Sequence, residues 1–247
     1  MVDLKRGFNR IGIYPLMAFI LAVYFVISFF RYGVSIIPQV LIAVATAFVL
    51  DHLIIYAEEK RFRLHTSPII SGLFIGLILD PSNLLYIPLA AAVFAILSKH
   101  VLRFGKQIFN PATFGIILVY FIFGAEIGWV GAFSIIAIAL GSILLHVKFK
   151  RFHLVLSFLI TFFIISLVYS VFWGNASTAL FLNYPLYFMA SFMLVEPKTS
   201  PISRNARIYY GFFAAIVIFL GGIVFPEAIL LGLLISNLFV PLFNRIK

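Results

Sequence analysis

Two short apolar runs decide the fold of this chain, because both are interrupted in the same way. Residues 68–82 read PIISGLFIGLILDPS, and residues 185–199 read PLYFMASFMLVEPKT. Each run begins at a proline and ends at an acid followed by proline, and the two acids, Asp80 and Glu196, are 116 positions apart. A straight helix needs about 20 residues to cross a bilayer, so both runs are too short to span it. The repeated pattern predicts two related halves, each with one broken helix.

The residues around these runs are those of a membrane protein. Of the 247 residues, 64% are hydrophobic and only 11% are charged, whereas a soluble surface needs roughly a quarter charged residues. Ten apolar segments lie between turn-forming breaks, and the third and eighth are short. They run approximately over residues 12–30, 34–56, 68–79, 84–102, 110–124, 128–147, 152–173, 181–195, 207–224 and 227–243. The sequence therefore predicts an all-α polytopic membrane protein with a single transmembrane domain over residues 1–247.

The basic residues predict how these segments are oriented. With the N-terminus in the cytoplasm and the segments alternating, seventeen of the eighteen lysines and arginines fall on the inner side, and only Arg31 falls outside. This asymmetry follows the positive-inside rule. The net charge of +10 therefore indicates topology and contact with the anionic lipid bilayer, and we expect no nucleic-acid partner. We expect an integral protein of the cytoplasmic (inner) membrane with both termini in the cytoplasm.

The ten segments divide into two repeats of five, over residues 12–124 and 128–243. Because five is an odd number, the second repeat must be inverted in the membrane relative to the first. Asp80 then falls at the outer face and Glu196 at the inner face. Short, proline-broken helices at matching positions of inverted repeats point to a binding site, since broken helix ends need protein, water or a ligand around them.

The fifth segment begins with Asn110, Pro111 and Thr113. Pro111 suits the first helical position, and Asn110 can cap the helix with its side-chain oxygen. The same helix start also offers free N–H groups and a partial positive charge to an anion or to the carbonyl groups of a ring. The spacing leaves helix capping and ligand binding equally open.

Acidic residues are scarce along the apolar segments. Asp51 lies beside His52, one to two turns inside the inner end of the second segment, and Asp80 lies at the end of the third. Acids inside a membrane are costly and often functional, so Asp51 and Asp80 are candidates for an ion or proton path. The structural alternative for Asp51 and His52 is a pair that snorkels to the membrane interface.

The residues that the chain lacks exclude several kinds of chemistry. It contains no cysteine, which excludes disulfides, thiolate zinc sites and cysteine-ligated iron–sulfur clusters. It also has no histidine pair with metal-ligand spacing on a helix, no glycine-rich phosphate loop and no Ser/His/Asp arrangement. A self-contained hydrolase or kinase is excluded, and redox chemistry would need an organic cofactor or the metals of another subunit.

Two stretches resemble one family of membrane proteins. Residues 105–115, GKQIFNPATFG, resemble its Gly-Lys-x-x-Phe-Asn-Pro-Ala segment. Residues 192–201, FMLVEPKTSP, and 207–211, RIYYG, resemble its Asp-Pro-x-Thr-Ser-Pro…Gly-Arg-x-x-Tyr-Gly segment. The family is that of the RnfD protein of the Rnf electron-transport complexes and the NqrB protein of the sodium-pumping NADH:quinone reductase. The resemblance covers nearly the whole chain and agrees with the ten-segment, inverted-repeat plan.

The resemblance implies a membrane subunit in which electrons pass between flavins while ions are translocated. The candidate cofactor-binding residues that it gives, together with the spacing above, are Asn110, Pro111, Thr113, Glu196, Thr199 and Ser200. In this family FMN is attached to a threonine of a Ser-Gly-Ala-Thr motif, but here the loop after the fifth segment is only FGAEIG at residues 123–128. The flavin, FMN or riboflavin, is therefore expected to be held non-covalently.

The expected function is that of a redox subunit of a multi-subunit oxidoreductase. Nothing in the sequence binds NADH or iron–sulfur clusters, so its electrons would come from partner subunits that carry iron–sulfur clusters or flavins. The alternative is a transporter or channel for a small polar solute, for example a flavin, because inverted repeats with paired half-helices suit solute conduction. A scaffold role in a larger membrane complex is a third interpretation.

Overall fold

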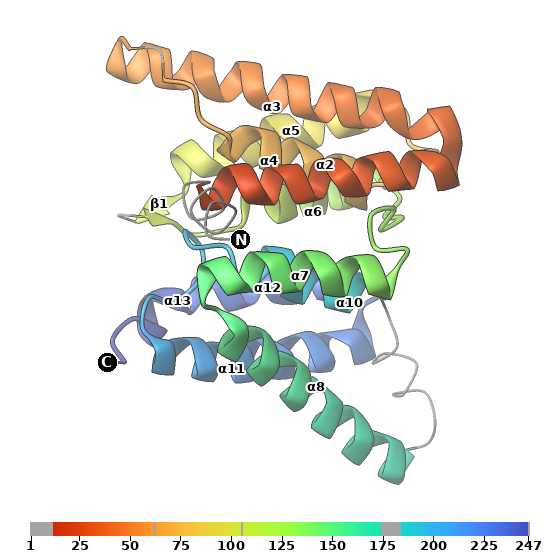
Figure 1. Ribbon diagram of the computed structural model, residues 1–247, viewed down its shortest axis with the longest axis vertical. Coiled ribbons are helices and arrows are strands. Elements are labelled where there is room, and N and C mark those ends of the chain that lie inside the picture. Colours follow the sequence, from red (N-terminus) through yellow and green to blue (C-terminus); the bar gives the residue numbers. More distant parts are fainter. Residues whose placement is uncertain (1–11, 62, 105, 174–183, 247) are drawn as a thin grey trace, which may run out of the picture.

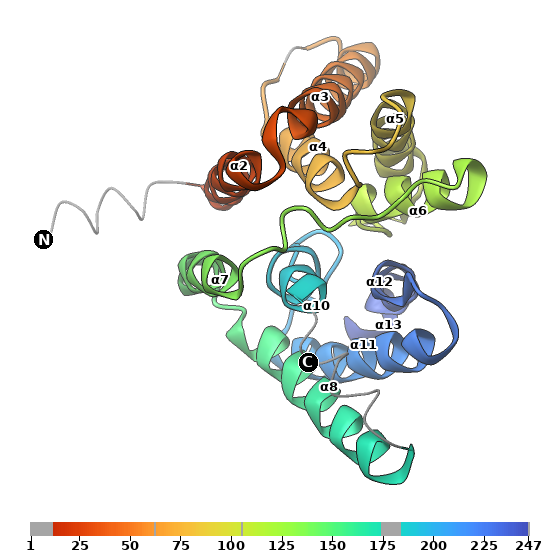
Figure 2. The ribbon, with the colours of Figure 1, turned by 90° about the vertical axis from the view of Figure 1, so that its right-hand side faces the viewer.

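The computed structural model describes residues 12–61, 63–104, 106–173 and 184–246. Its helices form two bundles stacked side by side, one for each half of the chain (Figure 1 and Figure 2). The first bundle contains α2 (Ile13–Tyr32), α3 (Ile36–Glu59), α4 (Ser67–Ile78), α5 (Tyr86–Val101) and α6 (Pro111–Phe123). The second contains α7 (Ile135–Phe149), α8 (Phe152–Trp173), α10 (Tyr184–Phe188), the π-helical segment η2 (Met189–Met193), α11 (Arg204–Val224), α12 (Ala228–Leu238) and α13 (Val240–Phe243).

Each of the ten predicted apolar segments contains a helix, so the all-α polytopic membrane fold is confirmed. The eighth segment is divided between α10 and η2, and the tenth between α12 and α13; the eighth was predicted to begin at residue 181, which lies outside the described residues. A short 3-10 helix, η1 (Gly33–Ser35), joins α2 to α3. Two-residue strands, β1 (Arg103–Phe104) and β2 (Lys106–Gln107), pair antiparallel just before α6.

The predicted start of the sixth segment is wrong, because α7 begins at Ile135 and residues 128–134 form a loop. Hydrogen bonds explain why this apolar stretch is not helical. The backbone N–H groups of Gly128 and Trp129 donate to the carbonyl of Ile78, at 2.9 and 2.8 Å. The loop thus satisfies carbonyl groups at the C-terminal end of α4, which a broken helix would otherwise leave unpaired.

Helix length and composition agree with a membrane location. Within the described residues, three helical stretches are long and apolar enough to cross a bilayer: Ile13–Glu59, Phe152–Phe172 and Arg204–Val224. Five shorter apolar helices of 10–17 residues accompany them. Large hydrophobic side chains such as Phe30 and Val171 are mostly exposed, as expected of a surface that faces lipid.

Successive helices cross the molecule in alternating directions (Figure 1). The first helices of the two halves, α2 and α7, therefore run in opposite directions. Lys60 follows the end of α3, Lys99 lies near the end of α5 and Lys148 lies near the end of α7, and these three helix ends lie on the left of Figure 1. Arg31 lies near the end of α2, which is on the right. We call the left end the basic end; it contains Lys60, Lys99, Lys148 and Lys198.

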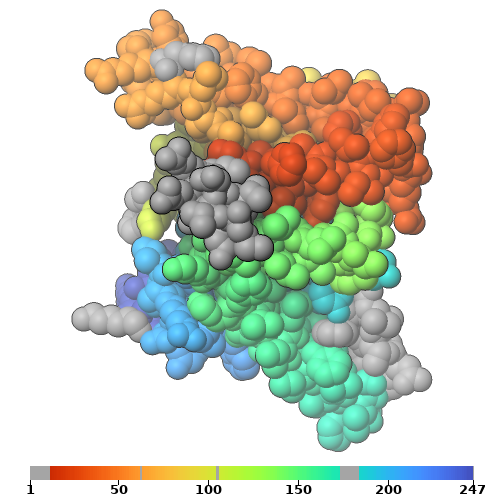
Figure 3. All heavy atoms as spheres, in the orientation of Figure 1, coloured from red at the N-terminus to blue at the C-terminus, as the bar shows by residue number. Residues whose placement is uncertain are grey.

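Aromatic packing joins the two halves. The ring of Tyr24 from α2 lies 5.5 Å, centroid to centroid, from Phe192 of η2, and Phe74 of α4 lies 6.0 Å from Phe188 of α10. The hydroxyl of Tyr24 also donates to the carbonyl of Ala137 in α7, at 2.6 Å. Figure 3 shows the atoms of α2 in contact with the segment that leads into α7. The broken helix of the second half is therefore held against the first half.

Glycines bring helices close together at equivalent places in the two halves. At Gly115 of α6, an added Cβ would collide with the carbonyl of Ala91 in α5. At Gly232 of α12, which is 117 positions later, an added Cβ would lie 2.5 Å from a side-chain atom of Ile218 in α11. The matching contacts support the division of the chain into two related halves.

Gly115→Ala is expected to lower the melting temperature, because the new methyl group would push α5 and α6 apart at a cost of about 1–3 kcal/mol. Gly222→Ala in α11 is the matched control, since a Cβ there would meet no atom within 4 Å. Alanine favours a helix over glycine, so the control should be as stable as the parent protein or slightly more stable. Thermal unfolding in detergent measures both variants, and equal destabilisation would contradict the close approach.

Candidate functional site

A buried polar network joins the two halves at the basic end. Asn110 caps α6, since its Oδ1 accepts hydrogen bonds from the backbone N and the Oγ1 of Thr113, each at 3.1 Å. Its Nδ2 donates to Oε2 of Glu196 at 2.8 Å. Asn110 is 1% exposed and Glu196 is 8% exposed. One side chain therefore connects the start of α6 with the end of the broken helix of the second half.

Asn237 of α12 also belongs to this network. Its Oδ1 accepts from the backbone N of Asn110 at 3.0 Å. Its Nδ2 donates to the carbonyl of Thr199 at 3.1 Å and to the hydroxyl of Tyr210 at 2.9 Å. All of these residues are buried, so each hydrogen bond replaces one that water would otherwise make.

Arg151, between α7 and α8, holds the loop that follows η2. Its Nη1 donates to the carbonyl of Val195 at 3.0 Å and to the hydroxyl of Ser200. The hydroxyl of Ser200 donates in turn to the carbonyl of Glu196 at 2.6 Å. Burial lowers the pKa of Arg151 to about 10, and the nearby Arg207 adds to this shift, so the guanidinium stays charged at neutral pH.

Glu196 is the acid of this network. It lies just beyond the end of η2, and burial raises the pKa of its carboxyl group. The positive charges of Lys198, Lys99 and Arg151 favour the ionised form and oppose this shift without cancelling it. Glu196 therefore holds a proton more readily than an exposed glutamate does.

The six residues predicted as cofactor contacts come together in this network: Asn110, Pro111, Thr113, Glu196, Thr199 and Ser200. Capping by Asn110 is confirmed, with Pro111 in the first turn of α6. Both polar atoms of the Asn110 side chain are engaged inside the protein, so direct contact with a cofactor stays a prediction.

Sequence reasoning missed three members of the network, Asn237, Tyr210 and Arg151. A signal existed for two of them. Asn237 is one of the few polar residues in an apolar segment, and Tyr210 lies within the RIYYG stretch that carries the family resemblance. Arg151 gave no such signal, because it stands in a basic cluster that the positive-inside rule already explains.

Asp51 lies at the centre of a second buried cluster at the basic end. It is 0% exposed, and its carboxylate lies 2.8 Å from Nζ of Lys99, 2.6 Å from Nε2 of His65 and 2.7 Å from Nε2 of His100. The structural alternative, in which Asp51 and His52 snorkel to the membrane interface, is wrong for Asp51, because its buried carboxylate faces Lys99 of α5. His52 instead places its Nδ1 2.8 Å from a carbonyl one turn earlier in α3.

Asp80 belongs to a separate group at the opposite end. Its Oδ1 accepts from the backbone N of Ser82 at 2.8 Å, and its own N donates to the carbonyl of Glu126 at 3.0 Å. The distance between Asp80 and Asp51 can be judged along α3. Gln39, near the start of α3, donates to two carbonyls near the end of α4 and so marks the end of α3 that lies beside the Asp80 group. Asp51 lies twelve residues further along α3, at a distance of about 18 Å from Gln39. A path that uses both acids stays a prediction.

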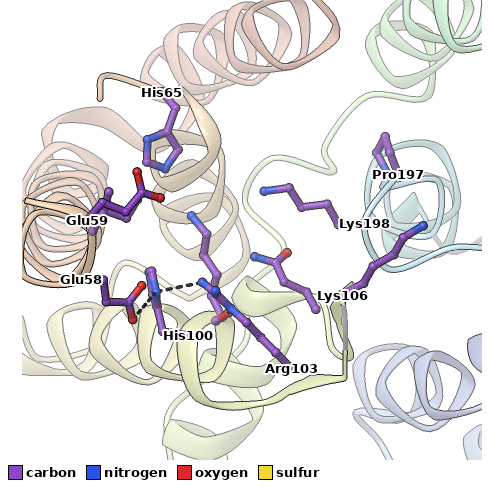
Figure 4. Close-up of a pocket in the computed structure, with 11 residues that line it drawn as sticks. Glu58, Glu59, His65, His100, Arg103, Lys106, Pro197 and Lys198 are labelled. Carbon is purple, nitrogen blue, oxygen red and sulfur yellow. Dashed lines mark hydrogen bonds and ion pairs between the residues drawn. The ribbon is translucent and has the colours of Figure 1, made fainter. Parts of the chain in front are cut away.

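A cavity of about 480 Å³ opens at the basic end beside both clusters (Figure 4). It is lined by Ile55, Glu58, Glu59, His65, Lys99, His100, Arg103, Lys106, Gln107, Pro197 and Lys198. Figure 4 shows Lys198 and Pro197, from the second half, facing Glu59, His65 and His100 from the first. The cavity has the volume of a small-molecule site, and both halves contribute to its wall.

Comparisons with known proteins agree with the two-fold division of the chain. The model of the NQR2, RnfD, RnfE family matches twice, over residues 2–133 and 122–247. The chain is also 27% identical, over 111 residues, to the D subunit of the ion-translocating oxidoreductase complex of Aliivibrio salmonicida (strain LFI1238). That alignment covers 42% of this chain and 31% of the relative, so it spans about a third of the relative's length. Because the two family matches together cover both helical bundles, the chain belongs to the NQR2, RnfD, RnfE family.

Proposed function

We propose that this chain is the membrane subunit of a flavin-dependent, ion-translocating electron-transport complex. The observation that carries the proposal is family membership across both halves. The similarity to a protein named as part of an ion-translocating oxidoreductase complex supports it further. Its electrons would come from partner subunits that carry flavins or iron–sulfur clusters, since the chain has no cysteine to hold such a cluster.

The proposed location is the inner membrane, with the basic end in the cytoplasm. The distribution of lysine and arginine supports this orientation. The opposite directions of α2 and α7 in Figure 1 support inverted repeats. The N-terminal residues 1–11 lie outside the described residues, so a cytoplasmic N-terminus rests on the charge pattern alone.

FMN or riboflavin, held non-covalently, is the proposed cofactor. When bound, a flavin supplies one- and two-electron transfer. The cavity at the basic end supports this proposal, because its volume of about 480 Å³ suits a molecule of this size. Arg103, Lys106 and Lys198 in its lining suit the phosphate of FMN. The residues present therefore fit the phosphate-bearing end of this cofactor.

The network around Asn110 would hold the residues beside the cavity in place. Asn110 fixes the position of Glu196, and Arg151 fixes the loop that carries Lys198. Burial makes Glu196 a group that can keep a proton at a higher pH than an exposed glutamate. Proton uptake and release at Glu196 is therefore the step that we assign to this chain during ion-coupled electron transfer.

Purified protein that is incubated with FMN or riboflavin and then desalted is expected to retain the visible absorption of a flavin. Acid precipitation should release the flavin into the supernatant, because the chain lacks the motif for covalent attachment. The spectra of pellet and supernatant measure this directly. Absence of retained flavin would contradict the flavin proposal, and flavin that stays in the pellet would contradict non-covalent binding.

Transport of a small polar solute is the alternative function. The feature that favours it is the pair of broken helices, whose acids Asp80 and Glu196 lie in polar groups at opposite ends of the molecule. Uptake of riboflavin into proteoliposomes that contain the chain and no electron donor would favour transport over electron transfer.

A further inference from the structure

The three partners of Asp51 share one carboxylate but differ in their access to water. Nζ of Lys99 lies 2.8 Å from Oδ1 and 2.9 Å from Oδ2 of Asp51, and Nε2 of His100 lies 2.7 Å from Oδ1. The side chains of Lys99 and His100 are 4% and 5% exposed, whereas that of His65 is 31% exposed. His65 is therefore the partner that can exchange a proton with water most easily.

His100 is held in its neutral form by Arg103. Nδ1 of His100 lies 2.9 Å from Nη2 of Arg103, and a guanidinium can only donate hydrogen bonds. Nδ1 must then accept, so the proton of the ring is on Nε2, which donates to Asp51. Arg103 is fixed in turn, because its Nε donates to the carbonyl of Lys99 at 2.6 Å. A second proton on His100 would face the guanidinium directly.

His65 is in the opposite situation, because both of its ring nitrogens face acceptors. Its Nε2 lies 2.6 Å from Oδ2 of Asp51, and its Nδ1 lies 3.1 Å from the carbonyl of Arg63. The carboxylate is ionised, since the ammonium of Lys99 contacts both of its oxygens. A carbonyl and a carboxylate only accept, and a neutral imidazole has a single N–H. Both contacts of His65 therefore exist together only when the ring carries two protons.

We propose that protonated His65 is a clasp that closes residues 63–66 onto Asp51 and opens when the ring loses one proton. A neutral ring keeps one N–H, so it loses either the bond to Asp51 or the bond to the carbonyl of Arg63. It also loses its charge attraction to Asp51, which stays paired with Lys99 inside the protein. Histidine is the side chain whose charge ordinarily changes between about pH 5 and pH 8, so the clasp is a pH-dependent device.

Other charged or titratable side chains surround His65 on α3, on α5 and in the second half of the chain. They are His52, whose ring centroid is 4.9 Å away, and Glu58, Glu59, Lys99, His100 and Lys198, which line the same cavity. Glu59 also pairs with Arg63 at 3.4 Å, but both side chains are exposed. Exposed ion pairs contribute little, so the buried carboxylate of Asp51 holds residues 63–66 more strongly than Glu59 does.

The clasp controls the start of α4, the broken helix of the first half. Residues 63–66 lead directly into α4, and Thr66 makes no side-chain hydrogen bond that caps this helix. His65 also belongs to the cavity wall that faces Pro197 and Lys198 of the second half (Figure 4). Opening of the clasp frees the start of α4 and widens the cavity on this side. It needs neither a flavin nor a partner subunit, so it is independent of the proposed function.

Nitrogen NMR of isotope-labelled histidine rings tests the protonation states, because protonated and bare ring nitrogens give well-separated signals. The purified full chain in detergent is compared at about pH 5 and about pH 9, on either side of the range in which histidine ordinarily titrates. We expect two N–H groups on His65 at the lower pH and one at the higher pH, with His100 keeping one. Arg103→Gln should allow His100 to take a second proton. A His65 ring that carries the same number of protons at both pH values would overturn the proposal.

Distances between two nitroxide labels test the movement. The chain has no cysteine, so Leu64→Cys and Val101→Cys give two labelling sites, at positions that are 73% and 72% exposed. Leu64 belongs to the clasped residues, and Val101 ends α5. We expect a narrow distance distribution at about pH 5 and a broader one, shifted to longer distances, at about pH 9.

Two variants of His65 should fix the clasp in opposite states. His65→Gln cannot take a proton, so the broad distribution should appear at both pH values. His65→Lys keeps a positive charge beside Asp51, so the narrow distribution should persist at both. Either variant also identifies the NMR signals of His65, so the test does not depend on both variants folding.

Arg63→Gln is the matched control, because it removes the pair with Glu59 but keeps the carbonyl that faces Nδ1 of His65. It should retain the pH dependence of the parent protein. Distances that do not change with pH in the parent protein, or that change equally in a His65 variant, would overturn the clasp. All measurements are made without flavin, so they leave the flavin proposal to its own test.

Discussion

Asp51→Asn is expected to lower the free energy of unfolding by about 3–5 kcal/mol, because it leaves Lys99 charged and buried without a partner. Lys99 is only 4% exposed and lies 2.8 Å from the carboxylate of Asp51. Asparagine has nearly the same shape as aspartate, so the packing of α3 against α5 is kept. The loss therefore reports the charge of Asp51 and not a cavity.

Unfolding of the protein in mixed detergent measures this effect, with Lys99→Met and the double variant Asp51→Asn/Lys99→Met for comparison. Removing both charges should recover much of the loss, since apolar replacements of a buried ion pair are often close to neutral. Asp80→Asn is the control, because asparagine can still accept the hydrogen bond from the backbone N of Ser82. A double variant no more stable than Asp51→Asn alone would contradict the pairing.

The Asp51 cluster also shapes the cavity. Its three partners Lys99, His65 and His100 all line the cavity wall. His65 belongs to the segment between α3 and α4, and the other two to the end of α5. The carboxylate of Asp51 therefore holds two separate parts of the cavity wall together. Its loss should also weaken binding of the proposed flavin.

The positions of the helices could be predicted from the sequence because apolar runs separated by turn-forming breaks mark them directly. The cap at Asn110 could be predicted as well, since Asn-Pro at a helix start is a local signal. The start of α7 was missed, although Ser134 caps this helix by accepting a hydrogen bond from the backbone N of Ala137. Residues 128–134 are mostly apolar, and they form a loop with a turn because their N–H groups donate to the carbonyls of Leu77 and Ile78 in another segment, which the sequence does not reveal.

The partners of Asp51 and Asn110 could not be predicted for a related reason. The helices α3 and α12 carry apolar side chains on all of their faces, so the sequence does not show which face contacts protein and which contacts lipid. Asp51 therefore resembled an interfacial residue, and Asn237 gave no indication of its partner. Their roles depend on which helices are neighbours, and hydropathy carries no information on that.

Asn110→Ala is expected to lower the free energy of unfolding by about 2–4 kcal/mol. The variant removes the cap of α6, which contributes about 1 kcal/mol. It also removes the hydrogen bond from Nδ2 of Asn110 to the buried carboxyl group of Glu196, which costs about 1–3 kcal/mol. Asn110→Asp is the informative comparison, since aspartate can still accept from the backbone N of Thr113 but places a second carboxyl group beside Glu196. If Asn110→Ala is as stable as the parent protein, the link between the two halves does not contribute to stability.

Glu196→Gln should make the stability of the protein less dependent on pH. Burial raises the pKa of Glu196 in the folded protein above its ordinary value of 4.5. Below pH 4.5 both the folded and the unfolded states are protonated at this position, so the raised pKa costs nothing. As pH rises from there through the folded pKa, the unfolded state loses its proton first, and the folded state loses stability relative to it.

Glutamine keeps an oxygen that accepts from Nδ2 of Asn110 but cannot ionise, so the variant should escape the loss of stability above pH 4.5. Melting temperatures of the two proteins, compared at intervals from about pH 4 to pH 8, give the difference directly. The advantage of Glu196→Gln should grow as pH rises. A difference that stays constant would mean that Glu196 has the same pKa in both states, and one that shrinks would mean that Lys99, Lys198 and Arg151 together outweigh burial. In either case Glu196 would no longer be a group that keeps its proton longer than an exposed glutamate, and the proton step assigned to it would fail with it.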